Sequence, residues 1–275
     1  MAHLNASQRR RRARLPINVL IPNMLTLLAL CSGLTAVRFA YEARWEYAML
    51  GILAAAILDA LDGRIARLLK GTSKFGAELD SLSDMICFGV APGLILYFWS
   101  LEKLGRLGWI LVLLYAVACV LRLARFNTAI EDPDVPAWAS TFFTGVPSPA
   151  AAGLVLLPMV ISFNLFEEYV RRPEVVAVFM VLVSFLMVSR IPTYSFKKVR
   201  LRPSLILPLM IAVGLIAASM LSAPWVTLSG VLVAYIISIP LAVRSYRAMC
   251  QRTGACDSDD DDSPVDIDLS GDTRP

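Results

Sequence analysis

The sequence predicts an all-α fold, a polytopic integral membrane helix bundle with about eight transmembrane helices. Hydrophobic residues make up 57% of the 275 residues, and the mean hydropathy is +0.64. Charged residues make up only 17%, against roughly 25% in a soluble domain. A helix needs about 20 mostly apolar residues to cross the hydrocarbon core of a bilayer, and eight stretches approach that length.

The first expected span follows a basic segment, residues 1–17, which contains the run RRRRAR at Arg9–Arg14. No small-residue cleavage site follows this run, so we expect an uncleaved first span rather than a signal peptide. The last two spans are separated by little more than Ser222 and Ala223, which predicts a tight hairpin. The eight expected spans are 18–40, 46–69, 77–99, 107–127, 149–166, 174–190, 203–221 and 224–243.

Lys and Arg residues are unevenly distributed among the segments that join the spans. A cytoplasmic N-terminus places 20 of the 26 Lys and Arg residues on the cytoplasmic side, as the positive-inside rule requires. Eight spans return the chain to that side. We therefore expect residues 244–275 to form a cytoplasmic, mostly disordered acidic tail, which includes the run DSDDDD at 257–262.

The available residue types limit the chemistry of any site. The chain has five cysteines without a CxxC pair, and His3 is its only histidine. This composition argues against a zinc site of the usual ligand types and against histidine-based acid–base catalysis. Carboxylates must therefore carry any catalysis, and we expect no nucleic-acid partner.

Four aspartates lie where the second expected span ends and the third begins. Asp59 and Asp62 are three residues apart, and Asp80 and Asp84 are four apart, so each pair shares a helix face. Between the pairs, the short stretch LKGTSKFG at residues 69–76 contains two glycines and predicts a turn that brings the four carboxylates together. Converging carboxylates at membrane depth repel one another unless they are compensated. We expect them to bind two Mg²⁺ or Mn²⁺ ions, an arrangement suited to displacement at phosphorus.

Small and basic residues beside the aspartates suit a phosphate-bearing substrate. Gly63 leaves room for a ligand against the backbone, and Ala66 keeps the same groove shallow one turn later. Arg67 offers a phosphate contact, while Gly76 permits a tight turn and Ser73 places a hydroxyl in it. One aspartate at a helix end is usually a cap or a solvated charge. Four at these spacings, with glycine and arginine between them, favour a functional site.

The pattern D-x2-D-G-x2-A-R-x8-G-x3-D-x3-D, from Asp59 to Asp84, resembles the signature of the CDP-alcohol phosphatidyltransferases. The resemblance implies a six-helix core, here with an added C-terminal hairpin, and a transmembrane catalytic domain over residues 18–243. It implies that an alcohol attacks the β-phosphorus of a CDP-linked lipid and that CMP leaves. It also implies that Asp59, Asp62 and Asp80 bind the metals, and that Asp84 contacts the metal centre and acts as general base.

The resemblance also implies a binding site for the CDP-linked lipid. The stretch PNMLT at residues 22–26 is similar to the family's first-helix nucleotide contact, although it also fits a plain proline kink. The implied contacts to CDP-diacylglycerol are Asn23, Thr26, Gly63, Ala66, Arg67, Ser73 and Gly76.

Four further stretches resemble the bacterial phosphatidylserine synthases of this superfamily, namely SLSDMICFGVAPGLILY, LRLARFN, FTGVPSPAAAG and LMVSRIPTYSFK. The resemblance implies CDP-diacylglycerol as donor and L-serine as acceptor. Guanidinium groups near the metals suit a lipid phosphate and the serine carboxylate, although they also fit positive-inside anchoring. Residues 147–149 fit a pocket wall or a plain loop. The implied acceptor or phosphate contacts are Arg122, Arg125, Asn127 and Arg190.

Other functions remain open at this point. The acceptor could instead be glycerol 3-phosphate, an inositol phosphate or choline. A divalent-cation transporter is an alternative of another class, because intramembrane acids also mark ion paths, but no inverted repeat is evident. The resemblance implies a homodimer surrounded by membrane lipids in the bacterial inner (cytoplasmic) membrane, and the positive-inside bias predicts an active site at the cytoplasmic face.

Overall fold

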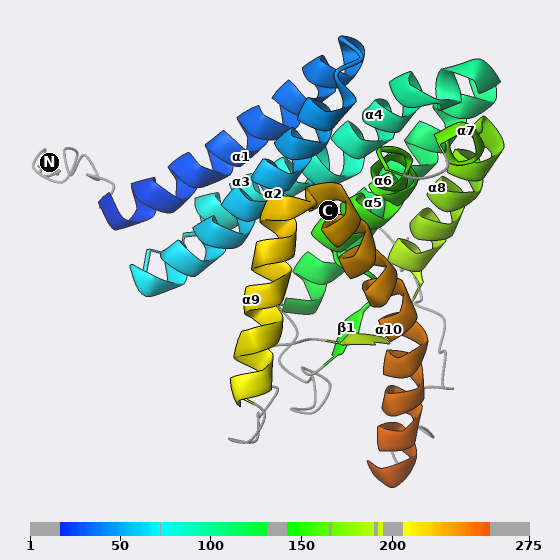
Figure 1. Cartoon of the computed structure of the whole chain (residues 1–275). Helices are drawn as coiled ribbons and strands as arrows, with labels where there is room; N and C mark the ends of the chain where they lie inside the picture. The colour runs from blue at the N-terminus through cyan, green and yellow to red at the C-terminus, as the bar shows by residue number, and fades with distance from the viewer. Residues whose placement is uncertain are drawn as a thin grey trace, which may run out of the picture.

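The computed structural model describes residues 17–71, 73–130, 142–164, 167–189, 192–194 and 206–253. These residues are almost entirely helical, and Figure 1 shows the helices and their order along the chain. The π-helical turn η2 and the 3₁₀ turn η3 interrupt the longer helices. The elements are α1 (Ile17–Tyr41), α2 (Trp45–Leu68), α3 (Lys74–Asp84), η2 (Met85–Val90), α4 (Ala91–Trp99), η3 (Leu101–Leu104), α5 (Arg106–Ile130), β1 (Phe142–Thr144), α6 (Ser148–Ser162), α7 (Glu167–Val170), α8 (Pro173–Val188), β2 (Pro192–Tyr194), α9 (Ile206–Ser222) and α10 (Pro224–Thr253).

Each expected span has a helical counterpart among these elements. Four helical segments are long and apolar enough to cross a membrane, and three further apolar helices are shorter. Helix α2 has the length of a span but carries aspartates and arginines near its end. This helix content is consistent with a polytopic integral membrane protein, and the count of eight spans stays a prediction. The four long segments are Val19–Tyr41, Lys74–Trp99, Arg106–Thr128 and Pro224–Leu241.

Helix α6 lies at the centre of the packing. It is apolar on all sides and buried along almost its whole length, as expected for a helix that neighbours surround. It contacts α4, α5, α8, α10 and η2. Helices α1 and α2 pair closely beside this core, and a Cβ added to Gly51 would lie 2.8 Å from the Cβ of Ala36. Small residues at this crossing therefore allow α1 and α2 to pack closely near the connection between them.

The C-terminal helices differ in one respect from the expected boundaries. Helix α9 packs mainly against α10, which in turn contacts α6 and β2; Figure 1 shows the pair in yellow and orange. Helix α10 continues to Thr253 instead of ending near residue 243. The helix therefore extends into the first residues of the expected tail, because Arg, Ala, Met and Gln in this stretch favour helix. Residues 1–16 and 254–275 lie outside the described residues.

A short pair of strands is an exception to the predicted all-α fold. Strands β1 and β2 pair antiparallel, with Phe142 opposite Tyr194. They join the connection between α5 and α6 to the connection between α8 and α9. Three-residue strands are too short to show an alternating pattern of apolar and polar residues, which is why the sequence did not indicate them.

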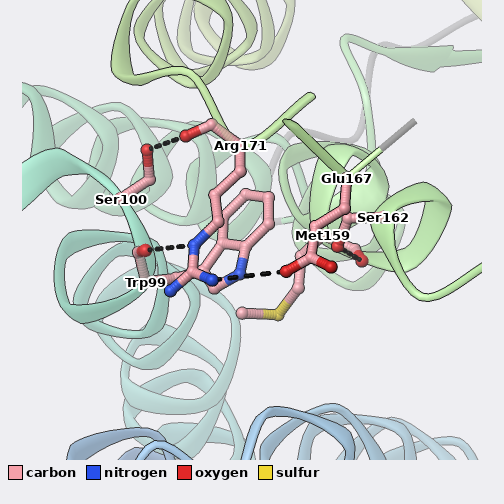
Figure 2. Close-up of polar contacts among 6 residues, drawn as sticks. All are labelled: Trp99, Ser100, Met159, Ser162, Glu167 and Arg171. Carbon is pink, nitrogen blue, oxygen red and sulfur yellow. Dashed lines mark hydrogen bonds and ion pairs between the residues drawn. The ribbon is translucent and has the colours of Figure 1, made fainter. Parts of the chain in front are cut away.

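Aromatic residues gather at the end of the bundle opposite the aspartates. The guanidinium of Arg171 lies 5.9 Å from the ring centroids of both Trp45 and Trp99. Figure 2 shows that Arg171 joins the end of α4 to α7, because its Nε donates to the Trp99 carbonyl, its Nη1 donates to Glu167, and its own carbonyl accepts from Ser100. Tryptophan is enriched near membrane–water interfaces, and this aromatic cluster around Arg171 is consistent with one at this end.

Candidate active site

The four aspartates come together between α2 and α3. Carboxylate oxygens of Asp59, Asp62 and Asp80 all lie within 4.8 Å of one another. Asp59 is also close enough to hydrogen-bond with the carboxyl groups of Asp80 and Asp84. Asp84 therefore lies at the edge of a cluster whose other three members could hold a metal ion together.

Helix α1 holds the cluster from one side. The hydroxyl of Thr26 donates a 2.5 Å hydrogen bond to Oδ2 of Asp62, and Asp62 is buried, with only 4% of its surface exposed. The hydroxyl of Ser83 on α3 donates to the Thr26 carbonyl at 3.3 Å. One residue of α1 thus contacts both helices that carry the acids.

A tight turn between α2 and α3 sets the distance between the two pairs of acids. Ser73 precedes α3, and its hydroxyl accepts a 3.0 Å hydrogen bond from the backbone N–H of Gly76, which is a helix N-cap. A Cβ at Gly76 would lie 2.8 Å from Oδ1 of Asn23. Glycine is therefore required for the close approach of α3 to α1. Ser73, expected as a nucleotide contact, has this structural role and also lines a pocket.

In the described part of the chain, no basic side chain pairs directly with the cluster. Asp80 Oδ1 and Asp84 Oδ1 are buried without a hydrogen-bond partner in that part of the chain. Buried carboxylates left in this way are costly, and oxygen ligands in such a group suit Mg²⁺ or Mn²⁺. The donor set therefore fits a divalent metal.

A pocket of about 580 Å³ opens on the α1 side of the cluster. Arg67 reaches along its wall, and its Nε donates a 2.9 Å hydrogen bond to the carbonyl of Gly63. Among the described residues, the one atom within 4 Å of a Cβ added to Gly63 would be Nη2 of Arg67, at 4.0 Å, so this part of the structure leaves the space beside Gly63 open. All seven expected contacts to CDP-diacylglycerol line this donor-side pocket: Asn23, Thr26, Gly63, Ala66, Arg67, Ser73 and Gly76.

A second pocket, of about 320 Å³, lies on the α5 side of the cluster. Asp84, Arg122 and Asn127 line it, together with Pro147 and Pro149. The two pockets share Ala77 and Asp80. A ligand in each pocket would therefore meet the other beside the carboxylates.

Two hydrogen bonds organise this acceptor-side pocket. Nη1 of Arg122 donates to the hydroxyl of Ser148 at 2.6 Å, and Nδ2 of Asn127 donates to the hydroxyl of Ser81 at 3.0 Å. Ser148 was recognised in the sequence only as part of a loop or pocket wall, and Ser81 was not singled out. The one sequence signal for Ser81 is its position directly after Asp80.

Among the described residues, Arg125 is expected at the acceptor but does not line this pocket. Arg125 is exposed, and its Nη1 donates a 2.8 Å hydrogen bond to the carbonyl of Val188 at the end of α8. Its position on α5 turns Arg125 toward α8, where it satisfies a terminal helix carbonyl, so the structure does not bring it together with Arg122 and Asn127. Arg190 lies outside the described residues.

Comparisons with known proteins agree with this geometry. The family model described as CDP-alcohol phosphatidyltransferase matches residues 19–189, and the model described as CDP-alcohol phosphatidyltransferase 2 matches residues 204–240. The first match includes all four aspartates and both pockets.

Curated relatives cover most of the chain. A protein of Mycobacterium tuberculosis strain H37Rv named CDP-diacylglycerol–serine O-phosphatidyltransferase is 40% identical to this chain, over 87% of this chain and 84% of the relative. A protein of Mycobacterium leprae with the same name is 36% identical, over 90% of this chain and 83% of the relative. One from Helicobacter pylori strain 26695 is 38% identical over 74% of this chain and 84% of the relative. With the family model spanning both pockets and the aspartates between them, this chain belongs to the CDP-alcohol phosphatidyltransferase family.

Proposed function

We propose that the protein transfers the phosphatidyl group of CDP-diacylglycerol to the hydroxyl of L-serine, giving phosphatidylserine and CMP. The observation that carries this proposal is the meeting of two pockets at Asp80, beside four clustered aspartates. A transferase with two substrates needs such an arrangement. The names of the mycobacterial and Helicobacter relatives support serine as the acceptor.

The donor lipid suits the pocket beside α1. Arg67 can contact a phosphate there, and Gly63 leaves the backbone accessible. Leu20, Met24 and Leu27 of α1 are exposed near the pocket residues of the same helix, so acyl chains can remain in contact with apolar surface. The cytidine would then occupy the polar part of the pocket near Asn23.

Two divalent ions, Mg²⁺ or Mn²⁺, would be held by the four aspartates. Asp59, Asp62 and Asp80 present oxygens close enough to share an ion, and Asp84 lies next to Asp59. When bound, the ions would neutralise the pyrophosphate and the departing CMP.

The acceptor suits the pocket that contains Asp84 and Arg122. Arg122 can bind the serine carboxylate, which leaves the serine hydroxyl near Asp84. The hydroxyl oxygen forms a bond to the phosphorus that bears the diacylglycerol, and the bond from this phosphorus to the bridging oxygen of CMP breaks. CMP leaves with the electron pair, and Asp84 accepts the hydroxyl proton.

The aromatic cluster around Arg171 supports an active site near the opposite membrane boundary. Asp62 lies about 25 Å along α2 from Trp45, at 1.5 Å per residue. A hydrocarbon core of about 30 Å then places the aspartates just inside the opposite boundary. The positive-inside bias makes this boundary the cytoplasmic one, so water-borne serine would enter from the cytoplasm. We infer a bacterial inner-membrane location and a homodimer on the family resemblance alone.

The organisation into segments is inferred on the same basis. Residues 18–243 would form the catalytic domain, residues 1–17 a basic cytoplasmic segment, and the chain after α10 an acidic tail. A truncation after Cys256 should therefore keep full activity.

The test is an acceptor panel. Purified protein in mixed micelles with CDP-diacylglycerol and Mg²⁺ should release CMP when L-serine is added, and much less with glycerol 3-phosphate, inositol phosphate or choline. A preference for one of these alcohols would reject serine but keep the reaction type. Failure of every alcohol to release CMP, together with cation flux in sealed vesicles, would instead support the transporter.

A further inference from the structure

Arg122 is held in the acceptor-side pocket by a neutral partner. Its Nη1 lies 2.6 Å from the Ser148 hydroxyl, and its guanidinium lies 5.5 Å from the ring centroid of Phe126, one turn further along α5. Arg122 is half-buried, whereas Ser148 has no exposed surface. The guanidinium is thus oriented by groups that carry no charge.

The position of Ser148 is itself well determined. It is the first residue of α6, directly after Pro147, and α6 is the central helix of the bundle. The thiol of Cys119, one turn before Arg122, also donates to the Ser148 hydroxyl at 3.8 Å. Two donors from one face of α5 therefore converge on one buried oxygen of α6.

Because the Ser148 hydroxyl is uncharged, it leaves the positive charge of Arg122 available for a ligand. No acidic residue of the described chain forms an ion pair with Arg122, although Asp84 lies within electrostatic range. An acidic partner would have neutralised the guanidinium, whereas a hydroxyl only sets its direction. The Arg122 guanidinium is thus half-buried, oriented by a hydroxyl and without an acidic ion-pair partner among the described residues. Such a cation in a pocket is suited to bind an anionic group of a ligand.

We propose that Ser148 is a positioning residue that aims the guanidinium of Arg122 at the carboxylate of the acceptor, and so makes the enzyme select an amino-acid alcohol. This inference rests on the proposed function, because it assumes serine as acceptor. A fixed guanidinium binds a planar carboxylate through two parallel hydrogen bonds. Without the Ser148 hydroxyl, the Arg122 side chain can move, so the carboxylate of an acceptor contributes less to its kcat/KM.

The experiment compares two acceptors that differ only at the group that Arg122 would recognise. L-Serine carries a carboxylate, and 2-amino-1,3-propanediol carries a hydroxymethyl group in its place. For Ser148→Ala we expect kcat/KM for serine to fall about tenfold, equivalent to ~1.4 kcal/mol. The value for the diol and the KM for CDP-diacylglycerol should stay within about twofold of wild type.

The matched control is Ser162→Ala at the far end of the same helix. Ser162 is also buried and hydrogen-bonded, to the Met159 carbonyl at 2.7 Å, as Figure 2 shows. This variant should keep the wild-type ratio of serine to diol. An equal loss for both acceptors in Ser148→Ala would identify a structural role and overturn the inference.

A second variant keeps the inference testable if Ser148→Ala folds poorly. Arg122→Lys retains the charge but loses the planar donor pair, so it should lower the preference for serine over the diol by a similar factor. An unchanged preference in Arg122→Lys would overturn the inference. Wild-type protein that uses no serine would overturn the proposed function itself, whereas serine-active wild type with unaltered preference in both variants would keep the reaction and overturn the roles of Ser148 and Arg122 in selecting the carboxylate.

Discussion

The hydroxyl of Thr26 on α1 donates a 2.5 Å hydrogen bond to Oδ2 of Asp62 on α2. The same hydroxyl lies 3.1 Å from the Pro22 carbonyl one turn earlier, so its position is constrained by its own helix. Through the Ser83 bond to its carbonyl, Thr26 also contacts α3. Thr26 therefore orients the carboxylate of Asp62, a candidate metal ligand. The i, i+3 spacing of Asp59 and Asp62 places both on one helix face but does not fix the direction of either carboxylate.

Replacing Thr26 with valine should weaken metal binding while keeping the shape of the side chain. Hydrogen-bond partners of metal ligands are typically worth about 10–100-fold in affinity or activity. We therefore expect the Mg²⁺ concentration for half-maximal CMP release to rise at least about tenfold in Thr26→Val. Thr26→Ser retains the donor and should remain near wild type. An unchanged Mg²⁺ requirement in the valine variant would show that this hydrogen bond does not orient a ligand.

Divalent metal should stabilise the folded protein, because it would offset repulsion among Asp59, Asp62 and Asp80. Binding to the native state raises stability by mass action, so adding Mg²⁺ or Mn²⁺ to chelator-treated protein should raise its Tm. Asp80→Asn should have a metal-free Tm at or above that of wild type, since it removes one repelling charge, and a much smaller metal-induced shift.

Glu167→Gln provides the control for this measurement, because Glu167 is exposed at the opposite end of the bundle. Its metal-induced shift in Tm should equal that of wild type. A shift of wild-type size in Asp80→Asn would exclude Asp80 as a ligand.

Asp84→Asn should nearly abolish turnover and leave donor binding largely intact. Asp84 lines the acceptor-side pocket but not the donor-side pocket, and loss of a general base typically lowers a rate by about 10²–10⁴-fold. Single-turnover CMP release measures the first effect, and equilibrium binding of labelled CDP-diacylglycerol measures the second. Near-normal turnover would reject Asp84 as the base.

Arg125→Ala should affect stability rather than acceptor binding. Arg125 donates to the carbonyl of Val188, so its loss leaves a helix terminus less well satisfied. We expect a Tm a few degrees below wild type and an unchanged KM for serine. Arg122→Ala, by contrast, should raise that KM strongly. A higher serine KM in Arg125→Ala would show that this side chain also reaches the acceptor.

Much of the helical architecture could be predicted from local patterns. Apolar length alone indicated where each helix lies, because the bilayer sets a minimum apolar length for a span. The spacing of Asp59, Asp62, Asp80 and Asp84 predicted their convergence, since positions three and four apart share a helix face. The end of α10 and the pair β1–β2 were not predicted. The last turns of α10 are polar and strands β1 and β2 have only three residues each, so neither shows a clear periodicity of apolar residues.

The sequence by itself determined the helices, the acidic cluster and, through its gap pattern, the family. The tertiary structure decided which of two nearby arginines reaches the pocket: Arg122 meets Ser148, and Arg125 meets Val188. It also decided that two pockets share Asp80. These relations depend on how each helix is rotated against its neighbours. That rotation is set by close contacts between residues distant in sequence, such as Gly76 against Asn23, and no local pattern records it.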